Sequence, residues 1–539
     1  MAKIRTLETI SLEQTPLVSP LLKSYLKQDK NVSSLFEKPV GLDQILAQAR
    51  VKKQQYSTGQ RNLLCEEIQN TYQNTLGYSA FSKAQEANIA LLKSQNTFTI
   101  TTGHQLNLLG GPMYFVCKIL EVIKISELAN QNQEGFTFVP VFWLASEDHD
   151  FLEINHFYVQ DKKYSWNQSF SGPVGRLPLD GLDKIFSDFL DQSPKTDFFE
   201  DLKQKITTSY LSSRNLSEAT FKWVNALFSS YGILVIEPDN PRLKQTMVPY
   251  FQKEIVENFT YKNTQKTLEN FPVKPQVNPR EINLFYLGKN LRERIVKLQD
   301  GRFQVLNTDL FFSLHELLRE IETAPEKFSP NVLLRPLYQE LVLPNVMYVG
   351  GGGEIAYWLE LKKVFESQET AFPILKLRNS LQLITQKQNK KRQALELDFV
   401  DLFLDPRNKI QEKVENESEL FKKLSFASEN LQGWFDELEK ETKSAGEQFY
   451  KMYLAQRKKQ TKGLEKLRQR MLKVESKKHL EFQERISALL EEIYPNQKLQ
   501  ERSESFLLSY LHYGDAFFSA YLSSIKDLGS RLIFLETEN

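Results

Sequence analysis

FTITTGHQLNLLGGPMYFVCKILEVIKISELA, residues 98–129, opens with a β-branched and aromatic run that ends at a glycine. From residue 112 onward the apolar residues recur every three or four positions, which predicts a helix that begins near Pro112. The next apolar run, FVPVFWLA at 138–145, is far shorter than the roughly 20 residues of a membrane-spanning helix. We therefore expect two buried strands with a helix between them, which is the unit of a parallel sheet.

Three later runs repeat this pattern and extend the predicted sheet. They are GILVIEPD at 232–239, NVMYVGGGG at 345–353 and FPILKL at 372–377. Strands that alternate with helices predict an α/β fold with a parallel sheet. The first 95 residues or so are expected to be mostly helical. Segments at about 150–230 and 255–310 are expected to be insertions, the second with a small hairpin or edge element.

The chain after Pro406 has a different texture, that of a helical coiled coil. Residues 411–450 hold ten acidic and five basic side chains, whereas residues 451–480 hold eleven basic and two acidic ones. This asymmetry predicts an antiparallel arm in which an acidic helix faces a basic one, although a single solvated helix would show the same counts. The predicted seam steps by three and four residues: Leu424, Ala427, Leu431, Trp434, Leu438, Leu464, Leu467, Met471, Val474, Phe482, Ile486, Leu489 and Ile493.

The totals set the class of protein. A chain of 539 residues exceeds one ordinary core; we expect a catalytic core over 1–380 and a helical domain over 381–539. A net charge of +1 argues against a global nucleic-acid or membrane field. Two cysteines exclude a disulfide scaffold and, with no apolar leader at the N-terminus, predict a cytoplasmic location.

The turn after the first strand is the first candidate for chemistry. Thr102, Gly103, His104 and Gln105 end the strand, and the pair at 110–111 precedes the helix. Glycines there would let backbone N–H groups approach a phosphate or carboxylate. Neither GxxxxGK[ST] nor GxGxxG occurs, so this is no P-loop or dinucleotide fingerprint. A plain strand–turn–helix remains the alternative.

The second candidate is the acidic cluster Ser146-Glu147-Asp148-His149-Asp150 after the second strand. Crowded carboxylates raise one another's pKa and are typical of acid–base sites, where one group could deprotonate an attacking amine. The alternatives are a helix N-cap run and, with less support from spacing, a metal site formed by His149, His156 and Asp150.

Two further segments follow later strands. The glycines at 350–353 with Glu354 offer close backbone approach to a ligand, or only a flexible turn. Arg335 lies in an otherwise apolar stretch upstream; it could bind a carboxylate or phosphate, or pair with Glu340. The segment Lys376-Leu377-Arg378-Asn379-Ser380 adds cations at the same sheet edge.

Together these segments resemble one family. TTGHQLNLLGGPMYFVCKILEVIKI, VPVFWLASEDHDFLEINH, SPNVLLRPLYQELVLPNVMYVGGGGEIAYWLELKKVF and FPILKLRNS resemble, in order and spacing, the cysteine ligases of bacillithiol synthesis. The resemblance implies a Rossmann-like core similar to class I aminoacyl-tRNA synthetases, with a dimerising coiled coil. It also implies addition of cysteine to glucosaminyl malate. In that analogy the Gly103 turn and residues 376–380 occupy the places of the two synthetase signature motifs. The family commonly has glutamine at the position of His104.

The resemblance also sets the expected partners: cysteine, glucosaminyl malate and a second copy of the chain, with no nucleic acid or membrane. The activating cosubstrate stays open, with ATP or another nucleotide as the candidate, and no metal is predicted. Other functions left open are a nucleotide-holding assembly protein without turnover and a synthetase-like RNA-binding enzyme. The predicted catalytic residues are Asp148, His149 and Glu147. The predicted binding residues are Thr102, Gly103, His104, Gln105, Gly110, Gly111, Tyr114, Ser146, Asp150, Asn331, Arg335, Gln339, Gly350, Gly351, Gly352, Glu354, Tyr357, Arg378, Asn379 and Ser380.

Overall fold

The computed structural model describes residues 4–77, 81–131, 134–168 and 170–538. The chain forms two compact units. Unit 1 is Met1–Leu383 together with Lys498–Glu538, and unit 2 is Ile384–Gln497. Among the described residues, no helix combines the length and the apolar character needed to cross a membrane.

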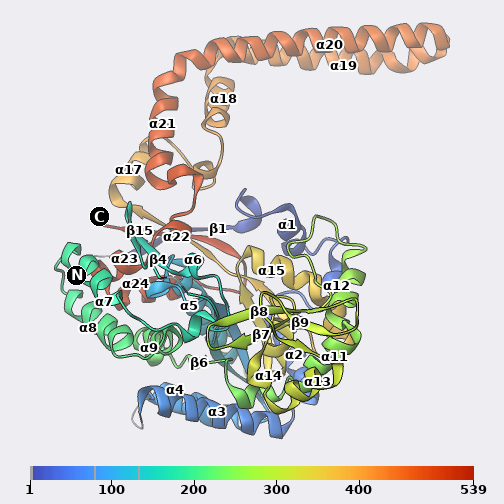
Figure 1. Ribbon diagram of the computed structural model, residues 1–539. Helices are drawn as coiled ribbons and strands as arrows, with labels where there is room; N and C mark the ends of the chain where they lie inside the picture. The colour runs from blue at the N-terminus through green and yellow to red at the C-terminus, as the bar shows by residue number, and fades with distance from the viewer. Residues whose placement is uncertain (1–3, 78–80, 132–133, 169, 539) are drawn as a thin grey trace. The chain divides into compact units, whose positions relative to one another are not determined.

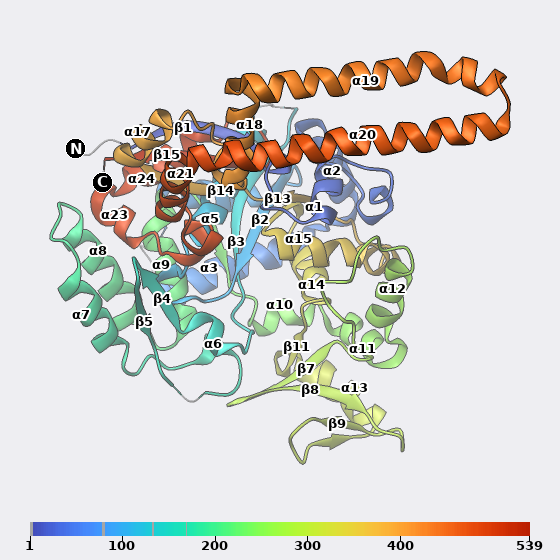
Figure 2. The same ribbon diagram turned by 90° about the horizontal axis from the view of Figure 1, so that it is seen from above.

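A five-stranded parallel sheet is the centre of unit 1, and its strands lie in the order β13-β12-β2-β3-β6. Figure 2 shows the paired strands β2 and β3 side by side. All five strands predicted from the sequence are present, so the predicted α/β class is confirmed. Almost every residue of these strands is buried, because helices cover a parallel sheet and its strands become continuous apolar runs. The strands are β2 (Thr97–His104), β3 (Thr137–Leu144), β6 (Leu234–Ile236), β12 (Asn345–Gly350) and β13 (Ile374–Leu377).

Helices pack on this sheet, and further helices pack on these. α5 contacts β2, β3 and β12, while α2 contacts β12 and β13. α5 begins at Tyr114, so Pro112 precedes the helix instead of starting it. The helices of this layer are α1 (Pro20–Leu26), α2 (Leu42–Gln55), α3 (Thr58–Leu76), α4 (Lys83–Leu92), α5 (Tyr114–Gln131), α15 (Gly352–Trp358), α16 (Lys362–Ser367), α23 (Leu507–Tyr513) and α24 (Asp515–Ser524).

The first insertion lies between β3 and β6 and is mainly helical. It begins with a short helix and a hairpin, and three longer helices follow. Its elements are α6 (Phe151–Ile154), β4 (His156–Val159), β5 (Lys162–Ser165), α7 (Leu182–Gln192), α8 (Phe199–Ile206) and α9 (Leu216–Phe228).

The second insertion, between β6 and β12, holds a separate antiparallel sheet in the order β10-β9-β8-β7-β11. It is larger than the predicted hairpin or edge element because β11, beyond the predicted insertion, pairs with β7. Its strands are β7 (Leu284–Gly288), β8 (Leu291–Lys297), β9 (Phe303–Val305), β10 (Phe311–Phe312) and β11 (Phe328–Pro330). Its helices are α10 (Pro241–Gln245), α11 (Val248–Glu257), α12 (Phe259–Leu268), α13 (Leu314–Thr323) and α14 (Arg335–Val342).

The last segment of the described chain belongs to unit 1. After α22 (Gln500–Ser503), the chain ends in β15 (Arg531–Thr537), which lies between β1 (Arg5–Ser11) and β14 (Ser380–Thr385). The sequence placed all of 381–539 in the helical domain. A pairing between strands more than 500 residues apart leaves no trace in a local pattern.

Unit 2 is a helical arm whose two longest helices, α19 (Glu419–Ser444) and α20 (Glu447–Ser476), run side by side as a hairpin (Figure 1). The acidic helix faces the basic one, as predicted: Arg457 of α20 binds Glu439 at 2.9 Å and also Asp436. The remaining helices are α17 (Gln386–Ala394), α18 (Pro406–Glu417) and α21 (Leu480–Ile493).

The packing seam of the arm agrees with the predicted one only in part. Met471, Ile486, Leu489 and Ile493 are buried, as predicted. Phe435 and Tyr453 are buried and in ring contact, whereas the neighbouring Trp434 is 55% exposed. Leu467 and Val474 are exposed as well. At the other end of the hairpin α18 adds apolar side chains, so the core there is shared by three helices: Ile410, Val414, Phe421 and Met471.

Candidate active site

A cavity of about 940 Å³ lies at the carboxyl ends of β2, β3 and β12. This is where open parallel sheets bind ligands. The second insertion forms the facing wall through Phe285 and Arg292 of the β7–β8 hairpin. The predicted site residues that line the cavity are Gly103, His104, Gln105, Tyr114, Glu147, Asp148, His149, Asn331, Arg335, Gly351, Gly352, Glu354, Tyr357 and Arg378.

The other predicted binding residues lie outside the cavity lining and have structural partners. Thr102 Oγ1 donates to the carbonyl of Val349 at 2.7 Å and so links β2 to β12. Gln339 is fully buried behind Arg335. Asp150 caps α6, so the N-cap alternative applies to this residue. The set is Thr102, Gly110, Gly111, Ser146, Asp150, Gln339, Gly350, Asn379 and Ser380.

The glycine pair before α5 makes a tight turn. Gly110 has φ +85°, and a Cβ there would meet the Phe115 ring at 2.7 Å. Its N–H donates to Asn107 and that of Gly111 donates to Leu108, at 2.9 and 2.8 Å. Both N–H groups are therefore used within the turn. The alternative of a plain strand–turn–helix, without a ligand, applies to this glycine pair.

Asp148 is held as an anion at the end of β3. Burial acts to raise its pKa, but hydrogen bonds from Gln105 and from the backbone N–H of His149, together with the nearby Arg292, hold that pKa well below its usual range. The Gln105 amide donates to Asp148 at 2.8 Å, and the backbone N–H of His149 donates at 2.7 Å. This carboxylate can bind a cationic group but is a weak proton acceptor.

His149 contacts the second insertion through its ring. Nη1 of Arg292 lies 2.7 Å from Nδ1 of His149, and the guanidinium stacks over Phe285 at 3.8 Å from the ring centroid. Because arginine only donates, Nδ1 must accept, and the proton of the neutral ring is on Nε2. His149 then presents a donor, not a base.

Glu147 is the third catalytic candidate and has a different environment. Its carboxylate binds Lys244 at 2.7 Å, and Lys244 also binds Asp239 at 2.8 Å. Lys244 is fully buried and Glu147 nearly so. Burial raises the pKa of Glu147 above its usual value, against the opposing effect of Lys244.

His104 and Glu354 form the floor with Lys118. Lys118 binds Glu354 at 2.7 Å and also donates to the carbonyl of Gly103. Although burial acts against its charge, Lys118 and hydrogen bonds lower the pKa of Glu354 to about 2. Burial, with Lys118, lowers the pKa of His104 to about 3, so its imidazole is neutral. His104 Nε2 is buried without a hydrogen-bond partner among the described residues.

The cavity is rich in arginine. Arg378 is buried and forms two bonds of 2.9 Å with Glu501, so its charge is already balanced. Five further arginines line the cavity, and among the described residues no carboxylate forms an ion pair with any of them. They are Arg280, Arg292, Arg294, Arg335 and Arg502. Cations without a carboxylate partner suit an anionic ligand.

Sequence reasoning missed Lys118, Arg280, Arg292, Arg294 and Arg502. Lys118 lies on the first turns of α5, four residues after Tyr114, and that spacing could have indicated it. The arginines of the second insertion follow no strand of the parallel sheet, so the strand-end rule could not find them.

Comparisons with known proteins extend these findings over almost the whole chain. Residues 6–379 match the model described as "Bacillithiol biosynthesis BshC, N-terminal Rossmann-like domain", and residues 381–535 match its "C-terminal coiled-coil domain". The chain belongs to the BshC family. A relative from Flavobacterium johnsoniae, named "Putative cysteine ligase BshC", is 39% identical and covers 97% of this chain and 98% of its own. Relatives of the same name from Christiangramia forsetii and Cytophaga hutchinsonii are 38% and 36% identical, covering 98% and 93% of each chain.

The BshC models fit both parts of the structure: a Rossmann-like parallel sheet and a helical arm. The resemblance of the motif segments to the family is thus confirmed. The roles of individual BshC site residues remain predictions that rest on the geometry given above.

Proposed function

We propose that this BshC protein forms the amide bond between cysteine and the amino group of glucosaminyl malate, the last step of bacillithiol synthesis. The observation that carries the proposal is the cavity itself, where arginines without carboxylate partners face the anionic Asp148. Such a site accepts a carboxylate-bearing amine, with the carboxylates on arginine and the ammonium on Asp148. The names of the relatives support a ligase.

Arg335 is the better candidate for the malyl carboxylates. Both Arg335 and Arg378 line the cavity, but Arg378 is already paired with Glu501. Among the residues that the structure describes, the Arg335 guanidinium bonds to neutral groups alone, the Tyr357 hydroxyl at 2.9 Å and the Gln339 side-chain oxygen at 3.2 Å.

Amide formation needs an activated cysteine carboxylate. ATP or another nucleotide is the proposed activator. It would give an acyl-adenylate with release of pyrophosphate, or an acyl-phosphate with release of the nucleoside diphosphate, at the Gly103 turn and the 351–353 loop, which both line the cavity. The bound ammonium first loses a proton to solvent, and the resulting neutral amine attacks the acyl carbon. A C–N bond forms, the bond from acyl carbon to phosphate oxygen breaks, and one amine proton passes to a base.

Asp148 and Glu147 have different roles in the transfer of this proton. Asp148 is ionised and hydrogen bonded, so it orients the amine. Glu147 lines the same cavity and has a raised pKa, so its carboxylate is the stronger proton acceptor of the two. This assigns the base to Glu147 instead of Asp148 or His149.

The test is product formation. The purified protein is incubated with cysteine, glucosaminyl malate and ATP, and bacillithiol is sought by mass spectrometry, with each reactant omitted in turn and other nucleotides substituted. Nucleotide consumption only when both cysteine and the amine are present supports a ligase. Nucleotide binding without consumption under every condition would instead favour an assembly protein without turnover.

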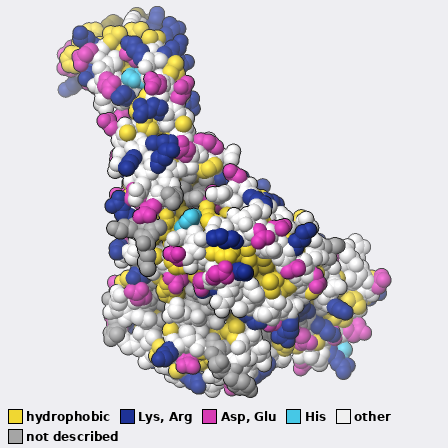
Figure 3. All heavy atoms as spheres, turned by 90° about the vertical axis from the view of Figure 1, so that its left-hand side faces the viewer, with side chains coloured by type: hydrophobic (Ala, Val, Ile, Leu, Met, Phe, Trp, Pro, Cys, Tyr) yellow, Lys and Arg dark blue, Asp and Glu magenta, His cyan; other side chains and the backbone are white. Residues whose placement is uncertain are grey.

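The arm is proposed to join two copies of the chain. Large apolar side chains are exposed along α19 and α20, and Figure 3 shows such side chains at the arm surface among charged ones. Fully solvated hairpins do not need these groups, whereas a second arm would bury them. Sedimentation should give a dimer for the wild type. A variant with Phe426, Trp434, Phe449 and Met452 changed to serine should be monomeric; a monomeric wild type would refute the proposal.

A further inference from the structure

Helix α14 connects the cavity to the interior of unit 1. Arg335, at its first turn, lines the cavity, while its last turn is buried. Three successive carbonyls of that last turn, those of residues 340–342, accept hydrogen bonds from Lys52 at 2.6 Å, Gln60 at 3.2 Å and Tyr56 at 2.5 Å. A helix C-terminus leaves such carbonyls without partners in the helix. Side chains at the end of α2 and the start of α3, about 280 residues earlier in the sequence, therefore anchor the helix that carries Arg335.

A chain of side-chain hydrogen bonds runs from Arg335 into this anchor. Arg335 donates to the side-chain oxygen of Gln339, and the Gln339 amide donates to Oε1 of Glu340; both hydrogen bonds are 3.2 Å long. A guanidinium can only donate and a carboxylate can only accept. The Gln339 amide therefore has one orientation that satisfies both neighbours. The direct pair of Arg335 with Glu340, left open by the sequence, is absent; Gln339 stands between them.

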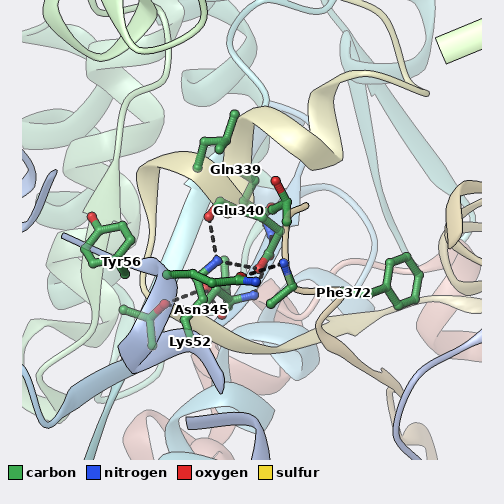
Figure 4. Close-up of polar contacts among 12 residues, drawn as sticks. Lys52, Tyr56, Gln339, Glu340, Asn345 and Phe372 are labelled. Atoms are coloured by element: carbon green, nitrogen blue, oxygen red, sulfur yellow. Dashed lines mark hydrogen bonds and ion pairs between the residues drawn. The ribbon is translucent and has the colours of Figure 1, made fainter. Parts of the chain in front are cut away.

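Several hydrogen bonds hold Oε1 of Glu340, the last acceptor in this series of side chains (Figure 4). It also accepts from the Asn345 amide at 2.7 Å, and the Asn345 oxygen accepts from Thr101 of β2 at 2.8 Å. The other oxygen of Glu340 lies 3.5 Å from the Lys52 ammonium. Lys52, Gln339, Glu340 and Asn345 are all at most 2% exposed.

Burial of this ion pair is costly. Burial raises the pKa of Glu340 and lowers that of Lys52, against the attraction between them. Replacing a buried ion pair with apolar groups of similar size is often neutral or stabilising. The stability of the fold thus gives little reason for a carboxylate at residue 340. The need of the Gln339 amide for a hydrogen-bond acceptor gives a better reason.

We propose that Glu340 is a positioning residue that acts through Gln339: its Oε1 fixes the Gln339 amide, which fixes the direction of the Arg335 guanidinium and so sets the affinity of the cavity for a substrate carboxylate. The inference rests on the proposed function only for the identity of that carboxylate.

Two double variants separate the acceptor from the charge. Lys52→Met/Glu340→Gln and Lys52→Met/Glu340→Leu both remove the ion pair, but only the first keeps an oxygen for Gln339. Malate is the probe, and its dissociation constant is measured by calorimetry on the full chain, with thermal unfolding in parallel. The Gln variant should bind within about twofold of wild type. The Leu variant should bind about tenfold more weakly, the equivalent of about 1.4 kcal/mol.

Gln339→Leu is the second measurement, because it breaks the chain and leaves the ion pair in place. It should lose the same tenfold in malate affinity. Arg335→Ala sets the limit of the effect. Equal malate affinity in the two double variants, or an unchanged affinity in Arg335→Ala or Gln339→Leu, would overturn the inference. If Lys52→Met/Glu340→Leu fails to fold, Lys52→Met/Glu340→Ala replaces it, because alanine also removes the oxygen that Gln339 needs. Failure of bacillithiol formation would count against the proposed function and leave these affinities to be compared.

Discussion

Nη1 of Arg292 and Nδ1 of His149 lie 2.7 Å apart, although the two residues come from different insertions and 143 positions separate them. The contact joins the β7–β8 hairpin to the end of β3 and fixes the tautomer of His149. It also places a half-buried cation beside Asp148 and Glu147, whose charges act on the pKa of Arg292.

Replacing Arg292 should therefore reduce catalysis more than folding. Arg292→Leu frees the His149 ring and removes a positive charge near Asp148, so we expect kcat/KM to fall about 100-fold, the equivalent of about 2.7 kcal/mol. Arg302→Leu, on the same insertion and half exposed in an ion pair with Asp300, should leave kcat/KM unchanged. Equal losses in the two variants would show that the hairpin matters only as a scaffold.

The two carboxylates should differ in their pH profiles. The pKa of Asp148 lies well below its usual range and that of Glu147 above it. If Glu147 accepts the proton, kcat/KM rises with pH through the Glu147 pKa. Glu147→Gln should lower the rate and abolish this acidic limb. Asp148→Asn should lower the rate at every pH and keep the limb, and circular dichroism should show both variants folded. An acidic limb that survives in Glu147→Gln would assign it to another group.

His104 should make stability depend on pH. Its pKa is about 3 in the folded chain and about 6.5 in the unfolded chain. Between these values the unfolded chain binds more protons, so stability is lost as pH falls from 6.5 toward 3. From pH 7 to pH 5 the loss due to His104 is about 2 kcal/mol. His104→Gln, which keeps a polar side chain that does not titrate, should lose less stability by that amount in urea titrations at the two pH values. Parallel losses in both proteins would contradict a neutral, buried His104.

Adjacent aromatic residues of the arm provide a matched pair. Phe435 is 4% exposed and packs on Tyr453, whereas Trp434 is 55% exposed. Phe435→Ala should destabilise the arm by about 3 kcal/mol, the lower end for a buried phenylalanine. Trp434→Ala should change the thermal unfolding of the arm little, but it should weaken a dimer formed through this surface. Equal destabilisation by both changes would show that Trp434 also packs in the seam between the two helices, as the sequence predicts.

The strands of the parallel sheet could be predicted because each is a local apolar run that ends in glycine or acid. Asp148 and Gly103 could be predicted for the same reason, since they follow such strands. Arg292 could not, because only the pairing of β7 with β8 brings it to the cavity. Trp434 was placed in the seam because a three- and four-residue spacing fits two adjacent registers of one helix. Only the partner helix, through Tyr453, selects Phe435.

Glu501, which balances Arg378 in the cavity wall, is made more than 120 residues after it, beyond the whole of unit 2. During synthesis the arm can pair its helices while the cavity still lacks this counter-charge and the sheet at β1 still lacks β15. The arm can therefore fold before unit 1 is complete, whereas the cavity receives its last charged partner only after residue 501 has been made. A nascent chain arrested at residue 497 would hold a finished arm and an unfinished cavity.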